Sequence, residues 1–194
     1  MNTVTSNEGF FAEQKSLDRI VLPQGYHEEL KTYLLEEREG IHAVLEDLGE
    51  EGLRQNAYVG CEEDKHVLLT DIEQLDPSIQ KELALYAAGL LNPLRNQLGS
   101  VGVVVSELAL DYAKSLAKSL ECSLLQHDYE SLVEIARQKG VEPKGKDCIA
   151  FSEYQSEGYT LYDAKALIYQ SLIWRLFDDS HADYGHAAIL LGME

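Results

Sequence analysis

Residues 178–186 hold the densest group of side chains that could bind a metal or exchange protons: Asp178-Asp179-Ser180-His181-Ala182-Asp183-Tyr184-Gly185-His186. Asp178 and Asp179 follow the predicted end of a helix, where the helix dipole disfavours anions by about 0.3–1 kcal/mol. Either a cation, from a metal or a partner, compensates for them, or the segment is an exposed loop in which Asp or Ser caps the next short helix. The spacing alone favours the loop, with His181 exposed and His186 at the start of a helix over 187–191.

A second group of candidate ligands lies earlier in the chain. His127 and Asp128 fall between two predicted helices, where a carboxylate can orient an imidazole or merely cap the next helix. Asp147 and Glu153 flank a possible strand and could point toward the same cavity. Two imidazoles, from His127 and His186, with one or two carboxylates suit Zn²⁺ or general acid–base chemistry. The sequence has no Gly-rich phosphate loop, serine nucleophile motif or His-Glu-x-x-His helix.

Charge and cysteine content restrict the class of partner. The chain has 194 residues, with 16 Lys and Arg against 34 Asp and Glu, so its formal net charge is −18. This balance argues against binding to nucleic acid, which needs clustered cations, and against docking on an anionic membrane. Cys61, Cys122 and Cys148 have no spacing typical of a disulfide framework or a zinc site. No signal peptide and no apolar stretch of about 20 residues is visible, so any export signal is expected outside this chain.

The elements that position these residues are predicted to be mostly helical. We expect a flexible tail over 1–20, an acidic helical N-terminal subdomain over 21–75 and a core over 76–194. Asp76 and Pro77 are typical of a helix start, and an apolar face continues from there to residue 94. Residues 101–105 and 148–151 are predicted as short buried strands, so the fold class is a helix-dominated α+β domain with at most two or three strands.

Three further helices are predicted after residue 105. Ser106 caps the first, and the second runs over about 129–139, with Gly140 at its C-terminal cap. Thr160 and Asp163 form a capping box for a helix over about 161–177, which is apolar nearly all round. Such a helix belongs in the middle of a domain, so we expect it to be the most buried element. Trp174 is expected to be buried there, with a loss of about 3–5 kcal/mol on truncation to Ala.

Four blocks of the sequence resemble the surface-exclusion domain family of Gram-positive cell-surface proteins. They are residues 20–26 (IVLPQGY), 82–99 (ELALYAAGLLNPLRNQLG), 127–128 (HD) and 184–192 (YGHAAILLG). The match spans about residues 20–192, and the order and spacing of the blocks make it fairly specific. The family is similar in turn to the CAP superfamily of cysteine-rich secretory, antigen and pathogenesis-related proteins. The resemblance implies an α-β-α sandwich with a cleft lined by two histidines and two acidic residues.

The resemblance assigns the cleft positions residue by residue. His127 matches the first cleft histidine and His186 the second. Asp147, followed by Cys148 and Ile149, stands where the superfamily has a glutamate, and the second acidic position has no clear match. The closing strands of the superfamily have no counterpart, because the chain ends just after the His186 helix.

Two functions follow as hypotheses. The resemblance implies an extracellular, wall-anchored protein that limits conjugative transfer between donor cells or mediates cell-surface recognition, with a cell-surface protein or a cell-wall component as its partner. The alternative is a metal-assisted peptidase or other hydrolase that uses His127 and His186, with Asp147 and Glu153 as possible further ligands of Zn²⁺. The shorter Asp147 side chain and the missing strands argue against the enzyme. A helical scaffold that only spaces or dimerises its neighbours is a third, simpler possibility.

Overall fold

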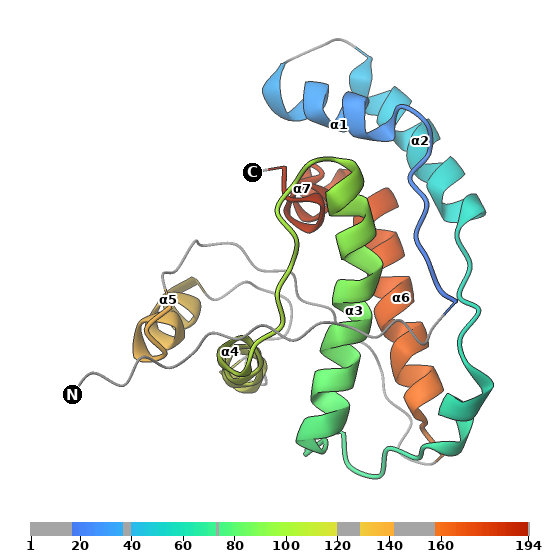
Figure 1. Ribbon diagram of the computed structural model, residues 1–194. Coiled ribbons are helices and arrows are strands. Elements are labelled where there is room, and N and C mark those ends of the chain that lie inside the picture. Colours follow the sequence, from blue (N-terminus) through green and yellow to red (C-terminus); the bar gives the residue numbers. More distant parts are fainter. Residues whose placement is uncertain (1–16, 37–39, 73, 120–128, 142–157, 194) are drawn as a thin grey trace. The chain divides into compact units, whose positions relative to one another are not determined.

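The computed structural model describes residues 17–36, 40–72, 74–119, 129–141 and 158–193 (Figure 1). The chain divides into two compact units, which are described separately. The smaller unit comprises residues 1–11 and 104–147, and the larger comprises residues 12–103 and 148–194. Within the described part of the chain, no helix is long and apolar enough to cross a membrane.

The larger unit is a set of helices around a shared apolar core. Its α-helices are α1 (Tyr26–Leu35), α2 (Ile41–Gln55), α3 (Pro77–Gln97), α6 (Leu161–Phe177) and α7 (Gly185–Leu191). Two short 3₁₀ helices, η1 (Glu62–His66) and η3 (Ser180–Ala182), lie between them in sequence. α6 contacts α2, α3, α7 and η1, and α1 packs on α2. This position explains why α6 is apolar on most of its surface, since neighbours cover it on several sides.

The residues predicted to cap the starts of α3 and α6 do so in the structure. The Asp76 carboxylate accepts a hydrogen bond from Ser78 N at 2.8 Å, with Pro77 in the first helical position of α3. Thr160 and Asp163 form the capping box of α6, each side chain accepting from the backbone N–H of the other. These caps satisfy amide groups that a helix start otherwise leaves without partners.

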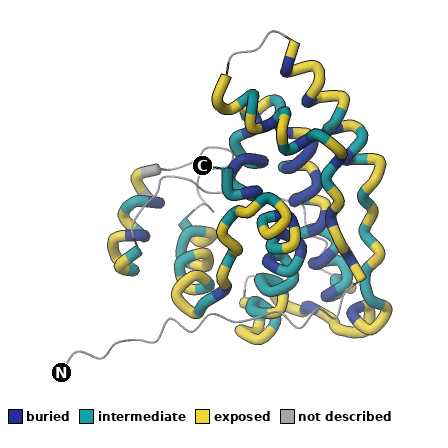
Figure 2. Tube along the Cα trace, turned by 45° about the horizontal axis from the view of Figure 1, so that its top comes forward, coloured by how far each residue is buried: buried dark blue, intermediate teal, exposed yellow. Residues whose placement is uncertain are grey.

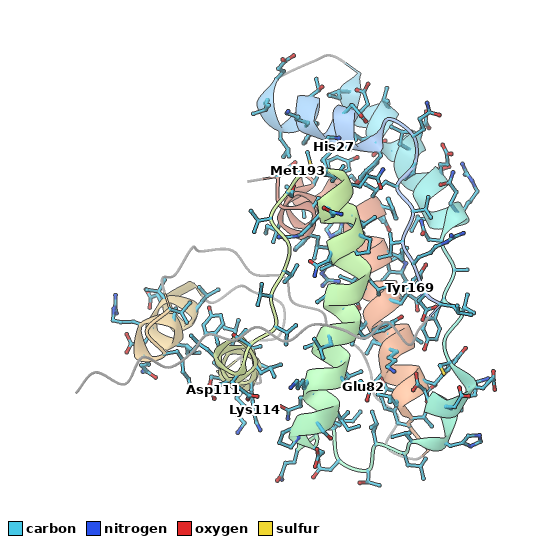
Figure 3. The ribbon with its side chains drawn as sticks, in the orientation of Figure 1. His27, Glu82, Asp111, Lys114, Tyr169 and Met193 are labelled. Atoms are coloured by element: carbon cyan, nitrogen blue, oxygen red, sulfur yellow. The ribbon has the colours of Figure 1, made fainter. Side chains whose placement is uncertain are left out.

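α6 contributes eight buried residues, more than any other helix of the described chain. Buried residues gather on the sides of the helices that face one another, and exposed residues line the outer turns (Figure 2). Tyr169 of α6 is buried, and its hydroxyl donates to Arg19 O at 3.0 Å (Figure 3). This bond ties the segment before α1 to the centre of the unit.

The prediction that Trp174 is buried is wrong, because its indole is 55% exposed. Gln170, Trp174 and Asp178 are spaced four residues apart and form an exposed stripe along α6 and its end. Leu172, Ile173 and the other core residues of α6 project elsewhere around the helix. Truncation of Trp174 to Ala should therefore lower the unfolding free energy by less than the loss of about 3–5 kcal/mol expected for a buried aromatic residue.

Two glycines allow α2 to approach the end of α6 closely. A Cβ atom at Gly49 would overlap the carbonyl oxygen of Phe177, and one at Gly52 would come within 2.6 Å of Cγ of the Phe177 ring. Tyr26 of α1 reaches the same end, where its hydroxyl donates to Leu176 O and its ring packs edge-to-face on Phe177. The end of α6 is thus held by α1 and α2 together.

α3 is joined to α7 through polar side chains of the Asn-Pro-Leu-Arg segment. Arg95 donates to the α7 carbonyls of Ile189 and Leu190 at 2.6 and 2.8 Å. A cation at the C-terminal end of a helix satisfies carbonyl groups and complements the dipole. Asn92 accepts from Val103 N and donates to Val103 O, so its amide pairs with one residue of extended chain as a neighbouring strand would.

The predicted strand over 101–105 does not form: Asn92 takes the backbone bonds at Val103 that a partner strand would supply. Within the described ranges, no strand is present: an isolated antiparallel bridge joins Leu68 to Thr160, and Val105 is a single bridge residue. The second predicted strand, over 148–151, lies outside the described residues. The helix-dominated part of the predicted fold class is confirmed.

The smaller unit contains α4 (Glu107–Ser119) and α5 (Tyr129–Gln138), which contact each other. The Ser106 hydroxyl accepts from Ala109 N at 3.2 Å, as its predicted capping role requires. Gly140 has a φ of 67° just after α5, in the left-handed region that suits glycine at a helix end.

Candidate functional site at the start of α7

The turn between α6 and α7 positions the first group of predicted site residues. After Phe177 the chain passes through η3, and Asp183 and Tyr184 then adopt φ angles of 50° and 57°. Left-handed conformations at two consecutive residues other than glycine cost free energy and persist only where the surroundings hold them. Hydrogen bonds from the backbone N–H of Asp183 to Ser180 O and of Tyr184 to Asp179 O supply this support.

Asp179 and His186 form a hydrogen-bonded pair. Oδ1 of Asp179 lies 2.6 Å from Nδ1 of His186, and Oδ2 accepts from Ala187 N at 3.0 Å. The Asp179 side chain is fully buried, whereas that of His186 is 21% exposed. The carboxylate therefore caps the first turn of α7 and fixes the orientation of the imidazole at once.

The sequence predicted correctly that His181 is exposed and that His186 lies at the start of a helix, which is α7. The structure adds that His186 is partly buried and has a carboxylate neighbour. The two aspartates differ in a way that their spacing did not indicate. Asp178 is exposed, but Asp179 is among the most buried residues of the unit, so the segment is not simply an exposed loop.

The pattern did not reveal three aromatic rings beside this pair. Tyr184 packs edge-to-face on Tyr33 of α1 and on His42 of α2, with ring centroids 5.1 and 5.7 Å away. The ring centroids of Tyr33 and His42 are 6.1 Å apart, and Nδ1 of His42 lies 3.3 Å from a carboxylate oxygen of Glu46. Burial raises the pKa of Tyr184 to about 12, with a further contribution from the negative charge of Glu46.

Three predicted members of the cleft lie outside the described residues: His127, Asp147 and Glu153. Of the proposed Zn²⁺ ligands, His186 alone falls within the ranges that the structure describes. Among those ranges, no group of three His, Cys, Asp or Glu side chains could hold a metal ion. The described residues therefore contain a histidine–carboxylate pair, and the four-residue cleft stays a prediction.

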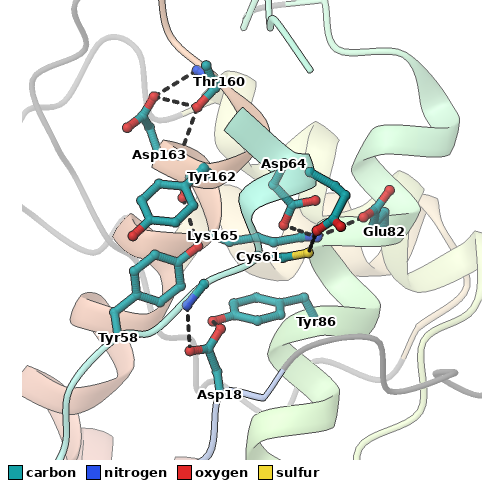
Figure 4. Close-up of polar contacts among 12 residues, drawn as sticks. Asp18, Tyr58, Cys61, Asp64, Glu82, Tyr86, Thr160, Tyr162, Asp163 and Lys165 are labelled. Atoms are coloured by element: carbon teal, nitrogen blue, oxygen red, sulfur yellow. Dashed lines mark hydrogen bonds and ion pairs between the residues drawn. The ribbon is translucent and has the colours of Figure 1, made fainter. Parts of the chain in front are cut away.

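A second polar cluster lies between η1, α3 and α6, with Lys165 and Asp64 buried and Glu82 about half exposed (Figure 4). The Lys165 ammonium donates to Asp64 and Glu82, both at 2.8 Å, with only 10% of its side chain exposed. Burial works to lower the pKa of Lys165, but its hydrogen bonds to Asp64 and Glu82 outweigh it and raise that pKa. The apolar pattern over 161–177 does not indicate that the lysine in the second turn of this helix is buried. The cluster joins three elements, which is a structural role.

Asp18 organises the neighbouring part of the same cluster. Its buried carboxylate accepts from Val59 N at 2.8 Å, from Gly60 N at 3.0 Å and from the Tyr86 hydroxyl at 3.0 Å. Burial, together with the charge of Asp18, raises the pKa of Tyr86 above its usual range. The segment before α1 is thereby attached to the chain that precedes η1.

Comparison with known proteins gives one structural relative. The solved structure of the CAP domain of enterococcal PrgA matches this chain with a TM-score of 0.70 and 24% sequence identity. The match covers 90% of this chain and 74% of the PrgA domain. No protein-family model matches the chain, and no curated protein does. This chain therefore has the fold of a CAP domain, as the sequence resemblance implied, although its described residues are helical and contain no sheet of the implied α-β-α sandwich.

Proposed function

We propose that this chain is the CAP domain of a bacterial cell-surface protein of the surface-exclusion type. In this role it limits conjugative transfer between donor cells or mediates recognition at the cell surface. The observation that carries the proposal is the fold shared with the PrgA CAP domain over 90% of this chain. The four sequence blocks described above support the same assignment independently of the overall fold.

The charge of the chain agrees with a role outside the cell. A net charge of −18 keeps an isolated domain soluble and repels anionic surfaces, so it favours contact with cationic groups of a partner. The partner is a cell-surface protein or a cell-wall component.

Deletion of the gene in a donor strain tests the proposal. Plasmid transfer into donor cells that already carry the plasmid should rise, and cell aggregation should change, because the recognition that limits redundant transfer is lost. Transfer into plasmid-free recipients is the control and should stay constant. Unchanged donor-to-donor transfer and aggregation in the deletion strain would remove the surface-exclusion function.

A metal-assisted hydrolase is the second candidate, and the Asp179–His186 pair favours it. A carboxylate that holds Nδ1 of an imidazole is the arrangement that orients a general base or a metal-bound histidine. Hydrolysis of a peptide library by the purified chain with Zn²⁺, lost in His186→Ala and retained in His181→Ala, would support this function. The same hydrolysis in both variants would exclude His186 from any catalytic role.

A further inference from the structure

Lys165, Asp64 and Glu82 bring an amine and two carboxylates into direct contact inside the larger unit (Figure 4). Both carboxylates lie 2.8 Å from the Lys165 nitrogen. The side chains of Lys165 and Asp64 are 10% and 11% exposed, whereas that of Glu82 is 45% exposed. An amine and a carboxylate that touch each other away from bulk water are the two reactants of an amide bond.

The two carboxylates are placed for different tasks. One carboxylate balances the charge of one ammonium group, so the second is available to accept and donate protons. Asp64 is buried beside the amine, and an amide formed with it would stay protected from water. Glu82 contacts the same nitrogen but also reaches solvent, so it can move protons between the nitrogen and a departing oxygen.

The backbone holds the reacting side chains together. Two hydrogen bonds of 2.9 Å join the chain that follows η1 to the start of α6, and one of them runs from Leu161 N to Val67 O. Val67 lies three residues after Asp64, and Leu161 lies four residues before Lys165. Groups that are fixed in contact react with effective concentrations of up to about 10⁵–10⁸ M, which offsets the unfavourable free energy of amide formation in water.

We propose that Lys165 and Asp64 become joined by an intramolecular isopeptide bond, with Glu82 as the proton carrier. The bond ties η1 to α6 covalently. It goes beyond the proposed function and does not depend on it, because the reaction needs only this chain.

The reaction is a condensation that releases one water molecule. The ammonium group first gives a proton to the Asp64 carboxylate along their hydrogen bond, which leaves a neutral amine and a neutral acid. Burial lowers the pKa of Lys165, but its hydrogen bonds to the two carboxylates outweigh burial, so this transfer is the uphill part of the reaction. The Nζ lone pair then attacks Cγ of Asp64. Glu82 takes a second proton from Nζ and delivers it to the departing oxygen, the C–O bond breaks, and the amide keeps one N–H.

The surroundings of the cluster favour the uncharged product. A buried ion pair carries a desolvation penalty that the attraction between its charges only partly offsets. The amide removes both charges from the interior. The Tyr86 ring, with its centroid 5.8 Å from Nζ, covers one side of the reacting groups and shields the product from hydrolysis.

The mass of the purified 194-residue chain tests the proposal. Under denaturing conditions the wild type should be lighter than its sequence by one water molecule. Trypsin should release a branched peptide in which residues 55–65 are attached to residues 147–175, because an acylated Lys165 is not cleaved. The exposed pair of Lys65 and Glu62, at 2.7 Å, is the internal control and should stay unlinked. A chain of full sequence mass, or a water loss located at other residues, would overturn the proposal.

Variants of the cluster separate the roles of its members, and circular dichroism reports whether each is folded. Lys165→Arg keeps a cation but has no amine to attack, so it should have its full sequence mass. Glu82→Gln cannot carry the proton, and its linked fraction should fall at least tenfold. Lys65→Arg leaves the cluster intact and should be linked as fully as the wild type. Undiminished linkage in Glu82→Gln, or a water loss in Lys165→Arg, would contradict the reaction, and the wild-type mass decides the matter even if a variant does not fold.

Discussion

The close approach of α2 to the end of α6 depends on the absence of a side chain at Gly49. In a Gly49→Ala variant the new Cβ would overlap the Phe177 carbonyl oxygen and lie 3.3 Å from the carbonyl carbon, where ordinary contact begins near 3.4 Å. The obstacle is backbone, so no side-chain rotation can relieve it. The two helices must separate, or α2 must shift along α6.

The expected cost is set by two opposing effects. Overpacking of a core typically costs about 1–3 kcal/mol, and a clash with backbone belongs at the upper end. Alanine gains about 1 kcal/mol over glycine inside a helix. The variant should therefore lose about 2 kcal/mol of unfolding free energy. For a chain of this size, that corresponds to a fall in Tm of roughly 4–8 °C.

Thermal and urea unfolding followed by circular dichroism measure this loss. Gly185→Ala in α7 is the matched control, because a Cβ there meets nothing within 4 Å and it should leave the stability within about 0.5 kcal/mol of the wild type. If Gly49→Ala were as stable as Gly185→Ala, the helices would have room to spare at residue 49, and the packing described here would be wrong.

Three further variants test the buried polar groups. Lys165→Ala leaves a carboxylate uncompensated in the interior and should cost about 3–5 kcal/mol in urea unfolding, against at most about 1 kcal/mol for Lys65→Ala, whose ion pair is exposed. Tyr184→Phe removes a hydroxyl without a described partner and should stabilise the chain by about 1 kcal/mol at pH 7. Because the folded pKa of Tyr184 is about 12 against 10 for an exposed tyrosine, the wild type should also lose stability relative to this variant as the pH rises from 10 to 12. His186→Ala should cost about 1–3 kcal/mol and impair surface exclusion, whereas His181→Ala should change neither, as measured by unfolding and donor-to-donor transfer.

Local chemistry in the sequence predicted most helix ends correctly. Asp76 with Pro77, and Thr160 with Asp163, act within three or four residues, so their roles do not depend on the rest of the fold. The same holds for Gly140 at the end of α5. An apolar helix near the end of the chain was also predictable, because few exposed helices have so little polar surface.

Tertiary packing decided the features that the sequence did not predict. Hydrophobicity placed Trp174 in the core, but only the arrangement of the neighbouring helices determines which side of α6 stays exposed. The residues near Lys165 in sequence do not indicate its partners, because Asp64 and Glu82 lie about 100 and 80 residues away and only the fold brings them to its ammonium group.

The candidate site was only partly predictable, because some of its residues are close together in sequence and others are not. His186 and the adjacent carboxylates were singled out because they are close in sequence. Tyr33 and His42 come from helices about 140 residues earlier and carried no motif of their own. A positive φ at Tyr184, a residue with a bulky side chain, also leaves no signal in the sequence.

Binding of the purified chain to intact cells tests the central claim most directly. The fluorescently labelled 194-residue chain is mixed with plasmid-bearing donor cells, and the cell-bound fraction is measured across a concentration series. A surface-recognition domain predicts saturable binding that excess unlabelled chain competes away and that heat-unfolded chain does not show. Linear, non-competable binding, equal for folded and unfolded chain, would contradict a recognition function at the cell surface.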